Sequence, residues 1–399
     1  MTGFALDAEQ RAFFDRVRAI AADQLRPLAE AGVPGRVNRE LIKAMGELGL
    51  LSRLFPGISG GSSLPWEADL SREAAAMDLC LLREALATRS TEAETALALQ
   101  GLGSYPVLQS GREEVVWRWL PAVAAGDVVA AFALTEPEAG SDAAALTLRA
   151  ERDGAGWRLT GEKIWISNAP EADFYTVFAR TTAGAGARGV SAFVVPGDRP
   201  GLSGEHLDMI SPHPIGRLVF DGVPVQGIEL LGEPDRGFRV AMRTLDLFRP
   251  SVGAFAVGMA QAAIDAAVAH AGSRTAFGGP LKDQQAVSHL LAEMATRTEA
   301  ARLLVYAAAS AYDSGGAGPG AGAGAGLGEK RIAAKSAMAK LFATETAQFV
   351  VDAAVQIHGA RALRRGHLLE HLYREVRAPR IYEGASEVQR TIIARELYR

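Results

Sequence analysis

Apolar positions recur with a helical period from residue 7 to about residue 125. The first helix is predicted to begin at Asp7, whose side chain forms a capping box with Gln10. Asn38 is expected to cap a second helix, and a third apolar run covers residues 73–86. These patterns predict an N-terminal helical domain over residues 1–127.

The pattern changes at Val128, where short β-branched and aromatic runs alternate with Gly, Pro, Asp and Asn. The runs are VVAAFALT, WRLTG, KIWIS, FYTVFAR, VSAFVVP and RLVF. Runs of this length and spacing predict an antiparallel β-domain over residues 128–235.

Helical periodicity then returns and continues to the end, with interruptions expected at Pro250, Pro280 and Pro379. The glycine-dense stretch 314–328 follows a helical pattern and lacks the G-x-G-x-x-G register, so we interpret it as a flexible connection between two antiparallel helices. Residues 236–399 are therefore predicted to form a C-terminal helical domain, and the fold class is α+β.

Composition narrows the class of protein. The 399 residues are 48% hydrophobic and carry a formal net charge of −4, which disfavours general nucleic-acid binding. Cys80 is the only cysteine, so no intrachain disulfide can form, and a cytoplasmic location is predicted. Cys80 itself is expected to be buried. Charged residues near the N-terminus disfavour a signal peptide, and the apolar stretch 249–265 is shorter than the roughly 18 residues of a membrane span.

Two patterns in the β-domain carry candidate chemistry. Residues 134–142, LTEPEAGSD, leave a strand and combine hydroxyls with turn formers, so they form either an ordinary loop or a contact for a polar heterocycle or phosphate. Residues 163–168, KIWISN, end a strand, and Trp165 is either a core residue or a cover for a flat ring.

Two further patterns lie in the C-terminal domain. In RTAFG, Arg274 is either a surface residue or a ligand for a pyrophosphate. In RIYEGASEVQ, Ser386 and Gln389 are expected to form a capping box for the last helix. Glu383 is either a carboxylate that favours that helix N-terminus or a general base presented beside a glycine.

The segment HLLEH at residues 367–371 matches a zinc pattern, but the arginines around it would repel a dication, so no metal is expected. The same arginines are interpreted as a solvated or subunit-facing surface rather than a nucleic-acid patch.

Five segments, in this order, resemble the acyl-CoA dehydrogenase family: FALTEPEAGSD, GEKIWISNAPEADFYTVFAR, SRTAFGGPLKDQQAVSHLLAEM, AAVQIHGA and RIYEGASEVQRTIIAREL. The resemblance implies an N-terminal helical domain, a central β-domain and a C-terminal four-helix bundle. It also implies FAD as cofactor and a homotetramer, or at least a dimer. The FAD-binding residues that it implies are Phe132, Leu134, Thr135, Ser141, Trp165, Ile166, Ser167, Arg274, Phe277, Gln284, Gln356, Gly359, Ala360, Ala385 and Glu387.

The same resemblance implies that Glu383 is the catalytic base in α,β-dehydrogenation of an acyl thioester. Some members place the base at the position of Phe248, which cannot act as one. The implied product is a trans-2-enoyl thioester, and the implied electron acceptor is an electron-transferring flavoprotein. The implied substrate-binding residues are Ser141, Asp246, Arg249, Tyr382 and Gly384.

Departures from the family pattern leave alternatives open. Ala360 and Ala385 replace a usual Gly and Thr, and Gln284 replaces a common His. The alternatives are a flavoenzyme of the same fold that acts on a carrier-bound acyl group or activates oxygen, and a non-catalytic flavin- or DNA-binding member. Near the expected acyl end, Arg89, Glu92 and Glu94 either meet a polar or carboxylated substrate tail or are exposed helix charges.

Overall fold

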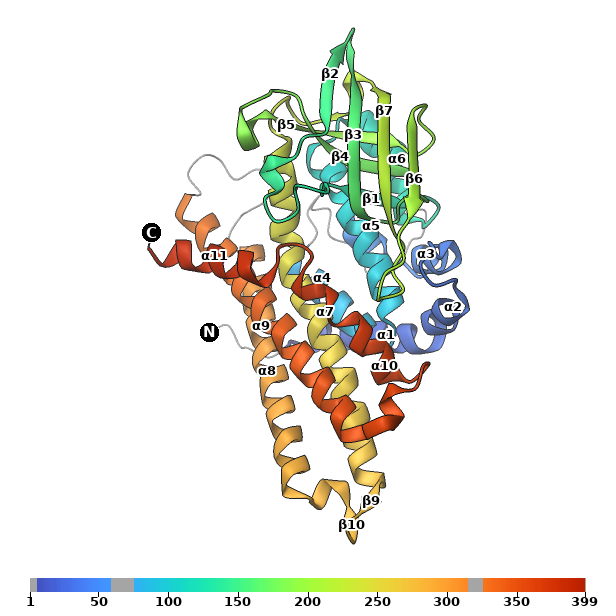
Figure 1. The fold of residues 1–399 in the computed structure, drawn as a ribbon, viewed down its shortest axis with the longest axis vertical. Coiled ribbons are helices and arrows are strands. Elements are labelled where there is room, and N and C mark those ends of the chain that lie inside the picture. Colours follow the sequence, from blue (N-terminus) through green and yellow to red (C-terminus); the bar gives the residue numbers. More distant parts are fainter. Residues whose placement is uncertain (1–5, 59–74, 315–325, 399) are drawn as a thin grey trace. The chain divides into compact units, whose positions relative to one another are not determined.

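The computed structural model describes residues 6–58, 75–314 and 326–398 (Figure 1). The chain divides into two compact units. The helical unit comprises Met1–Arg26, Ala75–Glu94 and Asp246–Arg399, and the sheet unit comprises Pro27–Ala74 and Thr95–Leu245.

The sheet unit contains an eight-stranded sheet in which β6, β7, β3, β2, β4, β5 and β8 follow one another and β1 pairs with β4. The pairing is mainly antiparallel, but β1 runs parallel to β4, and β2 meets β4 in parallel at a single pair of residues. The strands are β1 (Ala130–Ala133), β2 (Arg149–Asp153), β3 (Gly156–Ser167), β4 (Phe174–Arg180), β5 (Val190–Pro196), β6 (Leu202–His206), β7 (Ile215–Val225) and β8 (Leu230–Leu231).

The predicted runs FYTVFAR and VSAFVVP coincide with β4 and β5, both of which are almost entirely buried. The runs WRLTG and KIWIS belong to one strand, β3, whose pairing with β7 shifts register between Lys163 and Ile166. The strands β2 and β6 are largely exposed and polar, so they lack the apolar signal by which β1, β3, β4, β5 and β7 were predicted.

The helices before the sheet are α1 (Ala8–Ile20), α2 (Arg26–Ala31), α3 (Arg39–Glu47), α4 (Ala76–Ala87), α5 (Thr91–Ser110) and α6 (Glu113–Ala124). Asp7 and Gln10 form the predicted capping box of α1, and the Asn38 side chain accepts a hydrogen bond from the Leu41 N–H of α3. Cys80 is fully buried in α4, and burial raises the pKa of its thiol.

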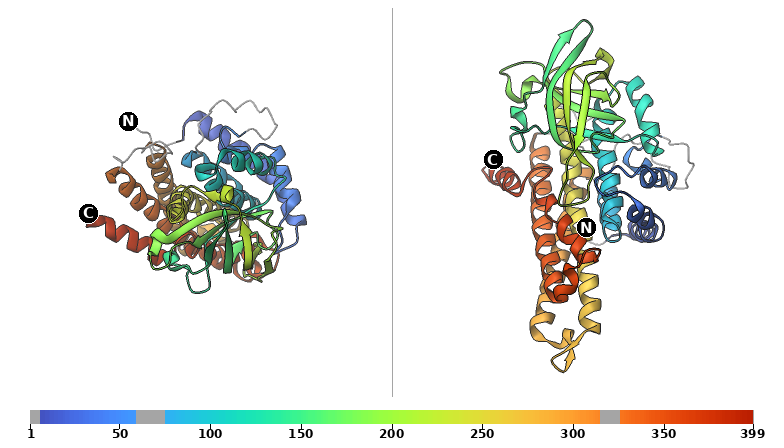
Figure 2. Two further views of the ribbon diagram at one scale, coloured as in Figure 1. Left: turned by 90° about the horizontal axis from the view of Figure 1, so that it is seen from above. Right: turned by 45° about the vertical axis from the view of Figure 1, so that its right-hand side comes forward.

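The helices after the sheet are α7 (Gly237–Ser273), α8 (Gln285–Ser314), α9 (Gly326–His358), α10 (Leu368–Glu375) and α11 (Ser386–Leu397). The long helices α8 and α9 lie side by side in the helical unit (Figures 1 and 2). Of the predicted glycine-dense connection between them, residues 315–325 lie outside the described residues. A short hairpin of β9 (Thr275–Ala276) and β10 (Gly279–Pro280) follows α7.

The expected interruption at Pro250 is wrong, because α7 runs through this residue without a break. Proline removes one backbone donor, but the surrounding segment of α7 is buried, and this packing maintains the helix. Among the described helices, α7 alone is long and apolar enough to cross a membrane, with a mean hydropathy of 1.6 over its most apolar window. Because 67% of that window is buried inside the protein, the window is also typical of a core helix.

Candidate active site

Glu383 lies in a short loop between a 3₁₀ turn at Ala378–Arg380 and α11. Glu383 and Gly384 both have left-handed backbone conformations, with φ angles of 51° and 97°. A residue with a side chain costs about 1–2 kcal/mol in this region, so the surrounding structure must hold Glu383 there. We call Tyr382, Glu383 and Gly384 the base loop.

Three side chains from three helices hold the carbonyl groups of the base loop. Lys340 Nζ in α9 donates to Tyr382 O at 2.9 Å and to Gly384 O at 2.6 Å. Arg249 Nε in α7 donates to Glu383 O at 3.4 Å. Gln389 Nε2 in α11 donates to Glu383 O at 3.3 Å and to Gly384 O at 2.9 Å. All three carbonyls of the loop are therefore bonded.

The carboxyl group of Glu383 is held differently from its backbone. Its Oε2 atom is buried and has no hydrogen-bond partner among the described residues. Burial raises the pKa of this carboxyl above its usual value, while the positive charges of Arg83, Lys340 and Arg249 act in the opposite direction. A carboxylate of raised pKa with a free oxygen atom is suited to proton abstraction.

Arg83 of α4 is almost fully buried, and its charge is satisfied by two neighbours. Its Nε atom donates to Glu94, and Nη1 donates to Ser251 Oγ at 2.7 Å. Glu94 is fully buried as well, so the interpretation of this residue as an exposed helix charge is wrong. The buried carboxylate of Glu94 is instead paired with Arg83, which lies on the preceding helix. Glu92, by contrast, remains half-exposed.

The predicted capping box of α11 is also wrong. Ala385, not Ser386, is the N-cap residue, and it makes no side-chain cap hydrogen bond. The Ser386 hydroxyl donates to Glu345 Oε1 at 2.7 Å, and Gln389 donates to the base loop. Both side chains therefore serve long-range contacts that local spacing does not reveal.

The loop that carries Thr135 and Ser141 is anchored in the sheet unit by a buried ion pair. Lys163 Nζ donates to Glu136 Oε1 at 2.8 Å and to Leu134 O at 2.9 Å. The Glu136 carboxylate also accepts hydrogen bonds from the backbone N–H groups at positions 147 and 148. These contacts fix the start of the loop, and farther along the loop the Ser141 side chain is exposed.

Two aromatic residues fit the interpretation of a flat-ring site. Trp165 lies at the irregularity of β3 with a φ of 59° and is 53% exposed, which excludes the interpretation of this residue as core. Phe277 has a φ of 53°, is 93% exposed and occupies the two-residue turn between β9 and β10. Exposed aromatic side chains in strained backbone suggest a covering ligand or partner, and the structure therefore fits an aromatic cofactor.

The remaining expected cofactor residues fall into two groups. In the sheet unit, Phe132 and Ser167 are half-buried, whereas the side chains of Leu134 and Ile166 are buried and leave only their backbone for a ligand. In the helical unit, the exposed residues are Arg274, Gln356, Gly359, Ala360 and Glu387, and the half-buried ones are Gln284 and Ala385.

Of the expected substrate residues, the structure brings four together within the helical unit. Arg249 joins the base loop and binds Asp246 through Nη1 and Oδ1 at 2.7 Å, and Tyr382 and Gly384 flank Glu383. Ser141 belongs to the sheet unit. Sequence reasoning missed Lys340 and Arg83. The available signal was one basic residue within a mostly apolar helical run, MAKLF for Lys340 and LCLLREALA for Arg83.

The two histidines of the HLLEH segment have other partners. His367 Nδ1 accepts a hydrogen bond from the Leu369 N–H at 3.1 Å, and His371 Nε2 lies 2.6 Å from Thr91 Oγ1. Within the described residues, no three histidine, cysteine or acidic side chains are grouped as metal ligands.

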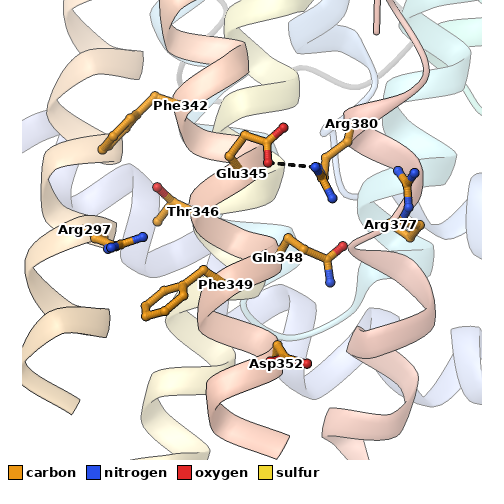
Figure 3. A pocket seen from close by; sticks show the side chains of 9 residues that line it. All are labelled: Arg297, Phe342, Glu345, Thr346, Gln348, Phe349, Asp352, Arg377 and Arg380. Carbon is orange, nitrogen blue, oxygen red and sulfur yellow. Dashed lines mark ion pairs between the residues drawn. The ribbon is translucent and has the colours of Figure 1, made fainter. Parts of the chain in front are cut away.

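A cavity of about 660 Å³ lies elsewhere in the helical unit, beside α9 (Figure 3). Figure 3 shows the side chains of Glu345 and Arg380, two of the lining residues, directed toward each other, and their ion pair is 2.9 Å long. The lining consists of Arg297, Phe342, Glu345, Thr346, Gln348, Phe349, Asp352, Arg377 and Arg380. None of the expected catalytic, substrate or cofactor residues contributes to this lining.

The sequence matches three family profiles that together span most of the chain. These are described as the N-terminal domain (residues 7–127), the middle domain (residues 131–223) and the C-terminal domain (residues 235–398) of acyl-CoA dehydrogenase.

Individual proteins are similar over the full length. Cyclohexane-1-carbonyl-CoA dehydrogenase of Geobacter metallireducens is 32% identical over 99% of this chain and 98% of its own. The structure of butyryl-CoA dehydrogenase from Megasphaera elsdenii is 31% identical, with a TM-score of 0.88 and complete coverage of both chains. A FAD complex of PigA is 26% identical, with a TM-score of 0.87 over 100% of this chain and 99% of its own.

Proposed function

Because this chain belongs to the acyl-CoA dehydrogenase family of oxidoreductases, we propose that it oxidises an acyl-CoA to the trans-2-enoyl thioester with Glu383 as base. The observation that carries the proposal is the Glu383 carboxyl group, which is buried, has an unpartnered Oε2 and lies in a strained loop fixed by three helices. The proposal also agrees with the acyl-CoA substrates named for the two relatives above.

The first step is removal of a proton from the α carbon of the thioester by the Glu383 carboxylate. Burial raises the pKa of this group, which makes its carboxylate a stronger base. The loop carbonyls are bonded to Lys340, Arg249 and Gln389, whereas the Glu383 N–H donates no hydrogen bond to the described residues. This N–H is therefore free to donate to the thioester carbonyl and to stabilise the charge that develops there.

FAD is the cofactor that this proposal requires. When bound, it supplies the acceptor for the hydride that leaves the β carbon. The residues proposed to hold it are Trp165 and the Thr135–Ser141 loop of the sheet unit, together with Arg274, Phe277 and Gln356 of the helical unit. The exposure of Trp165 and Phe277 supports this assignment.

The proposal extends to partners. Each oxidation would transfer two electrons from the substrate to the bound FAD, which must be reoxidised before the next turnover, and we propose an electron-transferring flavoprotein as the acceptor. The 93% exposure of Phe277 is consistent with cover from a second copy of the chain, and we propose a cytoplasmic homo-oligomer, a tetramer or at least a dimer.

Glu383→Gln is the direct test. The substitution keeps the size and the backbone contacts of the loop but removes the base, so we expect normal FAD content and a loss of about 10²- to 10⁴-fold in flavin reduction. The rate of flavin reduction is measured as anaerobic bleaching of the flavin by a panel of straight, branched, cyclic and dicarboxylic acyl-CoA thioesters. Bleaching of the variant at the wild-type rate would remove Glu383 from the mechanism.

The same panel addresses the alternatives. A non-catalytic flavin-binding protein would show no bleaching with any thioester. With an acyl carrier-protein thioester added to the panel, bleaching by that thioester alone would identify the substrate as a carrier-bound acyl group.

A further inference from the structure

Lys340 makes two hydrogen bonds to the base loop, and neither the sequence motifs nor the proposed function assigns it a role. Its side chain is 0% exposed. It extends from α9, which is far from residues 382–384 in the sequence. Its ammonium bridges the carbonyl groups on either side of Glu383, at 2.9 Å and 2.6 Å. A buried charged donor is rare unless the structure needs it, because removing an ammonium from water is costly.

The carboxyl group of Glu383 depends on the backbone for its direction. No hydrogen bond from the described residues reaches Oε2, so no side chain aims this oxygen. The left-handed conformation of Glu383 and Gly384 instead fixes where the Glu383 side chain leaves the backbone. Whatever holds the carbonyls of Tyr382 and Gly384 therefore sets the point from which the carboxyl group is presented.

We propose that Lys340 is a positioning residue for proton abstraction, which holds the backbone on both sides of Glu383 so that the base meets the α carbon of the substrate. This inference rests on the proposed function. Lys340 acts through the backbone of the base loop and does not exchange a proton with the substrate.

The charge of Lys340 strengthens both hydrogen bonds, since charged donors bind carbonyls more strongly than neutral ones. Burial lowers the pKa of Lys340 to about 8, against the opposing effect of Glu383. The other charged groups that face it are Arg249 from α7, Glu345 from α9 and Glu387 from α11. As the pH rises through about 8, Lys340 loses its proton, and its hold on the loop weakens.

The test isolates proton abstraction from hydride transfer. A 3,3-dimethylacyl-CoA has α protons but no β hydrogen, so the FAD-loaded enzyme in D₂O exchanges its α protons without oxidising it. The exchange rate and the Kd of this thioester are measured for wild type, Lys340→Met, Lys340→Arg and Lys335→Met. Lys335 is an exposed lysine on the same helix and serves as the matched control.

We expect Lys340→Met to slow exchange by about 100-fold, the usual effect of a base displaced by about 1 Å, with a change in Kd below about threefold. Lys340→Arg should recover most of the rate and lose the decline above about pH 8, because an arginine stays charged there. Lys335→Met should behave as wild type.

Three results would overturn the inference: wild-type exchange in Lys340→Met, a loss of thioester affinity that matches the loss of rate, or no recovery in Lys340→Arg. If Lys340→Met does not fold, Lys340→Gln replaces it, and failure of both to fold would assign Lys340 to stability alone. A wild-type enzyme that turns over no acyl-CoA would refute the proposed function itself, which is a different outcome from wild-type exchange in the variants.

Discussion

Two buried lysines hold two different loops, one in each unit. Lys163 of the sheet unit and Lys340 of the helical unit are both 0% exposed, and burial lowers the pKa of each to about 8. Lys163 binds a carboxylate, Glu136, and one carbonyl. Lys340 binds two carbonyls of the base loop and makes no ion pair within 4.0 Å among the described residues.

This difference distinguishes the structural contact of Lys163 from the proposed positioning contact of Lys340. The charge of Lys163 is neutralised by Glu136, whose carboxylate is also saturated by backbone donors, so the cluster is complete without a ligand. The charge of Lys340 is offset by carbonyl dipoles and by the charges of Glu383, Glu345 and Glu387, none of which forms an ion pair with it. The carboxylate form of the base and the charged form of Lys340 therefore stabilise each other.

Removal of Lys163 should have the largest effect on stability. Lys163→Met leaves the carboxylate of Glu136 without its cation, and we expect the free energy of unfolding to fall by about 3–5 kcal/mol. Urea unfolding followed by circular dichroism measures the change. The double variant Lys163→Met/Glu136→Gln should recover part of it, and a single variant as stable as wild type would show that the ion pair does not matter.

Removal of Lys340 should cost less stability than removal of Lys163. Lys340→Met leaves two carbonyls short of a donor but no unpaired carboxylate in contact, so a loss of about 1–3 kcal/mol is expected from the same urea experiment. A larger loss than that of Lys163→Met would reverse the comparison and make Lys340 chiefly a structural residue.

The third effect concerns pH. Arg83 lowers the pKa of Glu383, so its removal should raise that pKa and move the acid limb of the α-proton exchange profile to higher pH. The sign follows because only the carboxylate accepts a proton, and activity is lost as the pH falls through the pKa of Glu383. Arg83→Met/Glu94→Gln avoids an unpaired buried carboxylate. Glu94→Gln alone is the control, and an acid limb that stays in place would show that Arg83 does not influence the base.

Much of the fold was predictable because it depends on local patterns. The capping box at Asp7, the cap at Asn38 and the limits of β4 and β5 all follow from neighbouring residues. The polar strands β2 and β6 were missed, since an exposed strand receives its order from pairing with β3 and β7 rather than from its own apolar residues.

The candidate site was predictable only in part. The motif around Glu383 pointed to a base, and its assignment as the catalytic residue stays a prediction until it is tested. The roles of Ser386 and Gln389 were wrong, because their side chains bind Glu345 and the base loop instead of the helix N-terminus.

The sequence by itself indicated a helical region, a β region and a second helical region in that order, the family, and Glu383 as the candidate base, because each of these rests on patterns of residues that are close together in the chain. The tertiary structure decided which charges are buried and what holds Glu383 in place. Lys340 meets the base loop across about forty residues, Arg249 across 134 and Arg83 meets Ser251 across 168. Contacts over such distances arise only when the helices pack, and no local pattern of residues encodes them.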